Sequence, residues 1–255
     1  MQALAPAWNE FWLAWTFLTR LPAPVPVAYS EQGLNRAARF FPAVGAVLGI
    51  MCALVFWLTL QLLGSAWLAV LAQTVAGMLL TGAFHEDGFA DYCDSFGGQD
   101  VQSRLAIMTD SRLGTFGVAG LFSILALRGS LLVSLPLNSI PAAIIFAAVA
   151  SRLLAVSIMV DSDYVKAQGK SKPLATTMAW PGLLLSSLPL LPLLIWLPLA
   201  GFILCAGLLL LFRLAFVYQL RQRLGGYTGD SLGAAQQVSE VLIYVTLLAV
   251  FVRFG

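Results

Sequence analysis

The stretch FFPAVGAVLGIMCALVFWLTLQLLGSAWLAVLAQTVAGMLLTGAF, residues 40–84, decides the fold, because it contains no charged residue. As a helix it would measure about 67 Å at ~1.5 Å per residue, enough to cross the ~30 Å hydrocarbon core of a bilayer twice. Gly64 and Ser65, near its middle, are the expected turn. The stretch therefore predicts a helical hairpin that spans a membrane.

The composition of the whole chain agrees with a membrane protein. Of its 255 residues, 60% are hydrophobic and 10% are charged, whereas an ordinary soluble domain is roughly one quarter charged. This excludes a soluble enzyme, and the net charge of +2 excludes nucleic acid as a partner. Cys52, Cys93 and Cys205 suggest no disulfide framework. We predict one all-α domain, residues 1–255, in the lipid bilayer.

Three more apolar stretches complete the predicted topology. Residues 113–151 contain Arg128 as their only charged residue, with a turn expected at 135–138. Residues 173–212 contain no charge, and a break is expected near Pro198–Gly201. A last apolar segment covers residues 238–254. The prediction is a polytopic helical integral membrane protein of three hairpins and one terminal span, about seven transmembrane helices.

The first 39 residues are expected to form a separate cytoplasmic or interfacial segment. Trp8, Trp12 and Trp15 follow each other at helical spacing and share one face of a helix. Because Trp rings prefer the headgroup level, we predict an interfacial helix on the membrane surface; a short extra span is the alternative. A cleaved signal is not expected, since no basic residue precedes the apolar run.

The basic residues predict the orientation in the membrane, because an excess of Lys and Arg marks the cytoplasmic side. The loops expected near residues 64, 137 and 200 carry no charge. The other side collects nearly all basic residues of loops and termini, with Arg253 as the exception: Arg20, Arg36, Arg39, Arg104, Arg112, Lys166, Lys170, Lys172, Arg221 and Arg223. The N-terminus and most polar chemistry should therefore face the cytoplasm.

Half of the acidic residues, six of 12, lie between Glu86 and Asp110. Asp87, Asp91 and Asp94 are spaced to share one narrow helix face, where like charges repel each other. A divalent cation would relieve the repulsion, and oxygen ligands favour Mg²⁺, Ca²⁺ or Mn²⁺ over Zn²⁺. The sequence thus predicts a metal site in an acidic active-site loop at 85–114. A solvated acidic helix face is the alternative.

Other residues of this loop have less specific expectations. His85, the only histidine, is either a general base or substrate contact, or a structural hydrogen-bonding residue. Glu86 lies off the carboxylate stripe and is not expected to be a ligand. Asp110 and Arg112 precede a helix that Ser111 or Thr115 could cap. A phosphate could bind at that helix N-terminus, or the pattern is only an anchor and a cap.

A second polar patch precedes the last span. Gly225, Gly229 and Gly233 are four residues apart, which predicts a face for close helix packing in the membrane. Packing does not explain Asp230 or Glu240, because acidic residues in or beside spans are usually functional or paired. Asp230 is the expected second contributor to the metal site.

Several basic residues need partners. Arg128, Arg152 and Arg213 lie in apolar stretches, where an unpaired Arg costs roughly 3 kcal/mol on insertion scales. Each is expected to pair with an acid or a substrate phosphate, or to extend to the membrane surface. The loop with Lys166, Lys170 and Lys172 either binds phosphates or only reflects the charge bias.

At ordered motifs over most of its length, the chain resembles the cobalamin synthase family of adenosylcobinamide-GDP ribazoletransferases. The motifs are FLTRLP (17–22), FPAVG (41–45), GAFHEDGFADYCD (82–94), MTDSRLGTFG (108–117) and GGYTGD (225–230). Two positions depart from the family pattern. Glu86 replaces a usually apolar residue, and Ser95 follows the last aspartate where glycine is common. Neither change removes a matched acid.

The resemblance implies that adenosylcobinamide-GDP and α-ribazole, or its 5′-phosphate, give adenosylcobalamin, or its 5′-phosphate, and GMP. It also implies Mg²⁺ and the bacterial inner membrane, with the active site on the cytoplasmic side. The implied catalytic residues are His85, Asp87, Asp91 and Asp94, and the implied metal ligands are Asp87, Asp91 and Asp94, with Asp110 and Asp230 as further candidates. The implied substrate-binding residues are Asp110, Arg112, Lys166, Lys170, Lys172, Thr228 and Asp230.

Other interpretations remain open at this point. A CDP-alcohol type of membrane phosphotransferase also uses aspartates spaced on a helix. A cation-coupled transporter could place Asp and Arg in its pathway. A scaffold for a membrane-bound pathway would not need the acidic cluster. Homo-oligomers, or an association with other cobalamin-pathway enzymes, also stay open.

Overall fold

The computed structural model describes residues 6–165, 176–196 and 199–254. Within this part the chain is helical, apart from one isolated parallel bridge between Tyr164 and Tyr227, so the expected all-α fold is confirmed. The helices are α1 Pro6–Leu18, α2 Glu31–Ala37, α3 Phe41–Leu63, α4 Ala66–Thr81, α5 Phe84–Asp94, α6 Val101–Ile107, α7 Thr115–Ser134, α8 Ile140–Ile158, α9 Trp180–Ser186, α10 Leu199–Leu224 and α11 Gly229–Phe254. Short 3₁₀ segments cover Ala38–Phe40, Ser95–Gly97, Leu137–Ser139 and Leu188–Ile195.

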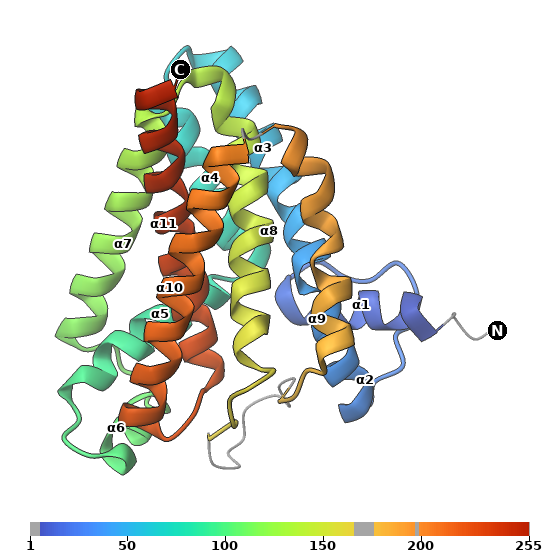
Figure 1. Cartoon of the computed structure of the whole chain (residues 1–255), viewed down its shortest axis with the longest axis vertical. Coiled ribbons are helices and arrows are strands. Elements are labelled where there is room, and N and C mark those ends of the chain that lie inside the picture. The colour runs from blue at the N-terminus through green and yellow to red at the C-terminus, as the bar shows by residue number, and fades with distance from the viewer. Residues whose placement is uncertain (1–5, 166–175, 197–198, 255) are drawn as a thin grey trace.

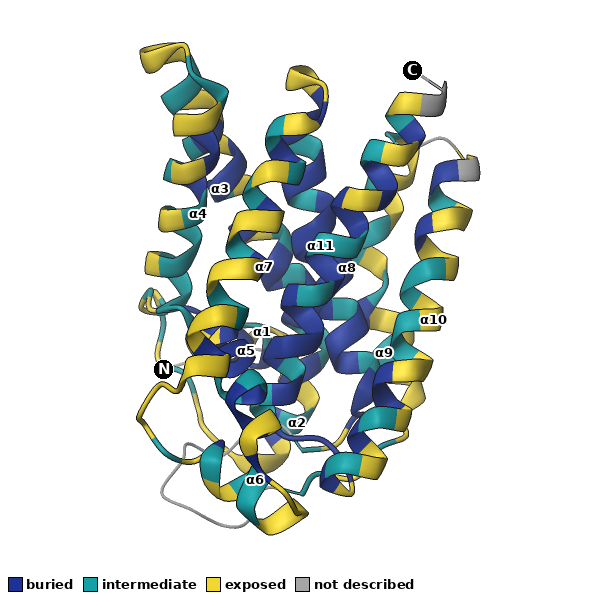
Figure 2. Cartoon of the chain, turned by 90° about the vertical axis from the view of Figure 1, so that its left-hand side faces the viewer, coloured by how far each residue is buried: buried dark blue, intermediate teal, exposed yellow. Residues whose placement is uncertain are grey.

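The long helices identify an integral membrane protein. Five of the described helical segments are long and apolar enough to cross a membrane, and a sixth is the bent pair of α4 with 84–97. The expected number was about seven. The difference lies in residues 180–195, which form a shorter apolar helix that continues in 3₁₀ geometry with Pro192 inside it. Figure 2 shows exposed positions on the outer faces of the long helices, where apolar side chains such as Leu79, Phe122 and Leu211 meet lipid.

Both predicted hairpin turns that can be followed are confirmed. Gly64 ends α3 in the left-handed region, at φ +66°, and Ser65 caps α4 by accepting the Leu68 N–H. The chain also turns at 135–138, between α7 and α8. The third expected break falls partly outside the described residues, which exclude Pro198.

Helix α8 is the centre of the bundle. In α8 and the turn before it, 78% of the most apolar window is buried, against 22% in α7 and α10. Helix α3 approaches it closely at Gly45 and Gly49, since a Cβ on Gly45 would overlap the carbonyl oxygen of Ala148. The core therefore lies between α3, α8 and α11.

The N-terminal segment packs at one end of the bundle, beside the start of α3 (Figure 1). At 13 residues, α1 is too short for a span, which agrees with the predicted interfacial helix. The buried carboxylate of Glu10 accepts hydrogen bonds from Arg36 at 2.7 Å and from Arg39 at 2.6 Å. These bonds hold α1 to the chain that enters the first span.

A sharp bend separates α4 from α5. Gly82 and Ala83 both adopt left-handed backbone angles, with φ of +70° and +56°, and the two helices meet at 89°. Helix α5 therefore crosses the end of the bundle instead of continuing the span. With this orientation, Glu86 of α5 lines a cavity between the spans and Asp87 lines a different cavity; Figure 1 shows α5 below the α4 span.

Candidate active site

A cavity of about 430 Å³ opens where α1, α5 and α11 meet. Asp87, on α5, and Asp230, in the first turn of α11, both line it. The described residues of its wall are Leu13, Thr16, Phe17, Thr19, Arg20, Tyr29, Leu34, Thr81, Gly82, Phe84, Asp87, Gly88, Gly229 and Asp230. The acidic loop and the second polar patch, which are far apart in sequence, therefore meet in one site.

Small residues allow this meeting. A Cβ on Gly88 would lie 3.0 Å from the Cα of Asp230, and a Cβ on Gly233 would lie 3.1 Å from the carbonyl oxygen of His85. The close packing predicted for the glycine patch is thus confirmed at Gly233. It is wrong for Gly225, which has open space around it and ends α10 with φ +81°.

The N-terminus of α11 is capped internally. The Thr228 hydroxyl accepts the Ser231 N–H at 3.1 Å, and the Ser231 hydroxyl accepts the Thr228 N–H at 2.9 Å. This cap starts the helix well before the apolar segment at 238–254, and so fixes Asp230 in its first turn. Thr228 is fully buried, and its hydroxyl has a structural role in this cap.

Hydrogen bonds also hold the chain after α8 beside the start of α11. Tyr227 donates its N–H to the Asp163 carbonyl at 2.8 Å and its hydroxyl to the Thr176 carbonyl at 2.9 Å. Burial raises the pKa of Tyr164, and the neighbouring charge of Asp230 raises it further. The lysine loop itself, with Lys166, Lys170 and Lys172, lies outside the described residues.

Asp94 makes contacts that its helical spacing did not predict. Its carboxylate accepts the backbone N–H groups of Gly114 and Gly117, each at 2.7 Å. These groups belong to the start of α7, so Asp94 caps that helix from a neighbouring helix. A Cβ on either glycine would overlap the carboxylate. The suggestion that Ser111 or Thr115 caps this helix is therefore wrong, because Asp94 accepts its first N–H groups.

The predicted trio of carboxylates does not gather. In the described part of the chain, no three His, Cys, Asp or Glu side chains lie close enough to hold a metal ion. Asp94 is turned toward α7, while Asp87 faces the cavity and Asp91 lies half-buried one turn further along α5. The carboxylates that share the cavity are Asp87 and Asp230.

Asp110 and Arg112 pair with each other at 2.5 Å, and Arg112 is fully exposed at the surface. Hydrogen bonds from Arg112 hold the pKa of Asp110 below its usual range. Neither residue is among the described ones that line the cavity. The structure thus brings this pair together but not to Asp87.

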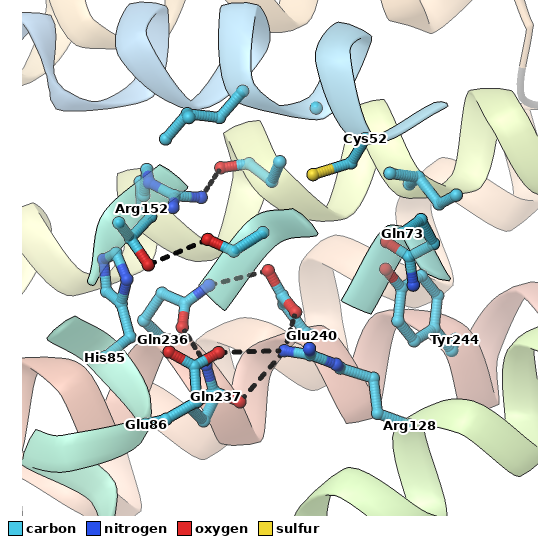
Figure 3. A pocket seen from close by; sticks show the side chains of 16 residues that line it. Cys52, Gln73, His85, Glu86, Arg128, Arg152, Gln236, Gln237, Glu240 and Tyr244 are labelled. Carbon is cyan, nitrogen blue, oxygen red and sulfur yellow. Dashed lines mark hydrogen bonds and ion pairs between the residues drawn. The ribbon is translucent and has the colours of Figure 1, made fainter. Parts of the chain in front are cut away.

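Glu86 and His85 point away from the cavity into the bundle. Both are buried and line a small polar cavity of about 60 Å³ between the spans. Arg128 donates to Glu240 at 3.0 Å and to Gln237 at 3.1 Å, and lies 3.7 Å from Glu86 (Figure 3). Arg128 therefore pairs with an acid, which was one of the expected alternatives, and that acid is Glu240.

The other two intramembrane arginines also have partners. Arg213 donates to Asp161 at 2.7 Å and to the Ser157 carbonyl, which confirms its pairing. Arg152 donates to the carbonyl of Ala148 at 2.9 Å and forms no ion pair with a described carboxylate.

Sequence reasoning missed the wall that the N-terminal segment supplies. Arg20 and Tyr29 line the cavity, although the Trp pattern suggested only a surface helix. The FLTRLP motif at 17–22 could have indicated this wall. It is part of the resemblance to the family, but no role was assigned to it.

Comparison with known proteins agrees with this architecture. Residues 10–248 match the family model described as cobalamin-5-phosphate synthase. Relatives named adenosylcobinamide-GDP ribazoletransferase include one of Ralstonia pickettii, 44% identical over 98% of both chains, and one of Shewanella frigidimarina, 45% identical over 95% of both. No solved structure gives a significant match. On the family model and these relatives, the chain belongs to the cobalamin-5-phosphate synthase family.

Proposed function

We propose that the protein is a membrane-bound adenosylcobinamide-GDP ribazoletransferase. It would join adenosylcobinamide-GDP to α-ribazole, or its 5′-phosphate, and release GMP with adenosylcobalamin, or its 5′-phosphate. The observation that carries the proposal is the match of whole chains, because relatives of this name align over 95% or more of both sequences. The matched region includes every residue described for the cavity.

The proposed reaction is a displacement at phosphorus. The ribose 3′-hydroxyl of α-ribazole attacks the phosphorus attached to cobinamide, a new P–O bond forms, and the bond to GMP breaks. The hydroxyl proton needs an acceptor, and Asp87 or Asp230 is better placed than His85. Both aspartates line the 430 Å³ cavity, whereas His85 is buried in the bundle.

Mg²⁺ fits the donor set of this cavity. Mg²⁺ prefers oxygen ligands and is commonly held by one or two carboxylates together with substrate phosphates. Asp87 and Asp230 would hold it, with Asp91 as a further candidate on the same helix. When bound, the ion would neutralise charge on the diphosphate and on the leaving GMP.

The cavity is proposed to face the cytoplasm of a bacterial inner membrane. Its walls include residues of α1, α5 and the start of α11. The start of α11 lies at the end of the bundle that also carries α2, α6 and the α10–α11 connection (Figure 1). These segments contain Arg36, Arg104, Arg221 and Arg223, and an excess of Arg and Lys marks the cytoplasmic side.

The test is a turnover assay on purified protein in liposomes. Adenosylcobinamide-GDP and each form of α-ribazole are supplied with Mg²⁺ or with EDTA, and GMP and corrinoids are followed by chromatography. We expect GMP release matched by cobalamin formation, abolished by EDTA and restored by Mg²⁺. Folded protein that gives no product with either acceptor contradicts the proposal.

The same preparation separates the other candidates. Release of CMP from a CDP-linked substrate would favour a CDP-alcohol type of phosphotransferase. Movement of a substrate into sealed liposomes without chemical change would favour a transporter.

A further inference from the structure

The cavity between Asp87 and Asp230 contains one basic side chain among the described residues that line it, that of Arg20. This arginine follows α1, in the N-terminal segment that the sequence suggested was only a surface anchor. A site for a diphosphate needs cationic groups, because the substrate and the two aspartates all carry negative charge.

Arg20 is held firmly at its backbone. Its N–H donates to the carbonyl of Leu80, at the end of α4, over 2.7 Å. Its guanidinium lies directly over Gly82, where a Cβ would overlap Nε of Arg20. Gly82 also has a positive φ, so glycine is favoured there for two independent reasons. The bend before α5 therefore also provides the surface on which the guanidinium of Arg20 packs.

The guanidinium of Arg20 nevertheless makes no hydrogen bond or ion pair with any residue that the structure describes. The other arginines at this end of the bundle donate to carboxylates or to backbone carbonyls: Arg36, Arg39, Arg104, Arg112, Arg221 and Arg223. Arg20 thus combines a fixed backbone with unused donors beside an open cavity of about 430 Å³.

We infer that Arg20 binds a phosphate group of the nucleotide-linked substrate, in the cavity that Asp87 and Asp230 also line. A guanidinium donates two parallel hydrogen bonds to phosphate oxygens and stays charged at all physiological pH values. The N-terminal segment is then a wall of the substrate site as well as an interfacial helix. This inference rests on the proposed function, which supplies the diphosphate.

The first test measures binding without turnover. Adenosylcobinamide-GDP alone is titrated into wild-type protein, Arg20→Gln and Arg20→Lys in nanodiscs, with no α-ribazole present. We expect Arg20→Gln to raise Kd about tenfold or more, and Arg20→Lys to raise it less, because Lys keeps the charge but loses the planar fork. The matched control is Arg36→Gln, which removes an arginine of the same segment while Arg39 still binds Glu10.

The second test needs no variant and so does not depend on folding of Arg20→Gln. Wild-type protein is treated with phenylglyoxal, and modified peptides are quantified by mass spectrometry with and without adenosylcobinamide-GDP. We expect the substrate to protect Arg20 but not Arg36. Equal modification of Arg20 in both samples, or an unchanged Kd in Arg20→Gln, would overturn the role of Arg20. Wild-type protein that neither binds this substrate nor forms product would instead overturn the proposed function.

Discussion

Asp94 of α5 accepts the backbone N–H of Gly117, in the first turn of α7, over 2.7 Å. This bond, together with the one from Gly114, makes an aspartate of the acidic run a cap for a transmembrane helix. The aspartates of the acidic run therefore have different structural roles. One aspartate holds two helices together, and Asp87 is left to face the cavity.

Asp94→Asn should mainly lower the stability of the fold, with a smaller effect on turnover. An amide is a poorer acceptor, so we expect a loss of about 2 kcal/mol in the free energy of unfolding. Gly117→Ala should cost a similar amount, since its Cβ would displace the carboxylate. Unfolding by SDS in mixed micelles measures both. A fully stable Asp94→Asn protein that has lost all activity would instead favour a direct role in the reaction.

Asp87→Asn, Asp91→Asn and Asp230→Asn should each lower kcat about 100-fold or more. The reason is the loss of a proposed ligand or proton acceptor at an accessible site. Mn²⁺, bound in place of Mg²⁺, can be counted by electron paramagnetic resonance in each variant. Glu31→Gln, an exposed acid on α2, is the control. Near-normal turnover of Asp91→Asn would remove that residue from the site.

Arg128→Met should strongly destabilise the membrane domain, because it leaves the carboxylates of Glu86 and Glu240 buried without their cation. Breaking a buried pair in this way costs about 3–5 kcal/mol. Adding Glu240→Gln to the same protein should recover part of the loss. Arg221→Met, at the exposed end of α10, is the matched control. A cost below about 1 kcal/mol for Arg128→Met would contradict the pairing.

Gly88→Ala should impair activity by moving α5 away from α11. The new Cβ would lie 3.0 Å from Cα of Asp230, so the distance between the two cavity carboxylates must change. We expect a higher Mg²⁺ concentration for half-maximal turnover. Gly207→Ala on α10 adds the same methyl group where nothing lies within 4 Å, and should leave turnover unchanged. Equal activity of both variants would show that the close crossing is dispensable.

Ala83→Gly should stabilise the protein, because Ala83 adopts φ +56°, which costs about 1 kcal/mol for a residue with a Cβ. Ala90→Gly, in the interior of α5, should instead lower stability by about 1 kcal/mol or more. Thermal unfolding of the two variants compares them directly. A destabilised Ala83→Gly protein would argue against strain at the bend.

The fold could be predicted because stretches without charge indicate segments that lie in the bilayer. The turns at Gly64 and at 135–138 could be predicted as well. The cost of burying charge predicted that Arg128 would need a partner, but for Arg213 it left pairing and extension to the membrane surface both open. The site was predicted only in part. Helical spacing placed Asp87, Asp91 and Asp94 on one stripe but could not show that Asp94 caps α7. That contact depends on a tertiary approach through Gly114 and Gly117.

The contribution of the N-terminal segment to the cavity wall could not be predicted from the sequence, for a related reason. Arg20 enters the site because the chain bends by 89° between α4 and α5, and helical periodicity gives no information on such a bend. Two consecutive left-handed residues, of which Ala83 is one, are not a pattern that composition predicts.

Glu86 and Asp87 are neighbours on one rigid helix, yet one lies among the spans and the other in the cavity. A ligand that shifts α5 through Asp87 would therefore also act on the contact between Glu86 and Arg128. Occupancy of the cavity and cohesion of the spans would then be thermodynamically linked, with a coupling that acts equally in both directions. A substitution deep in the bilayer that loosens Arg128 should weaken ligand affinity, and a bound ligand should make the spans harder to separate.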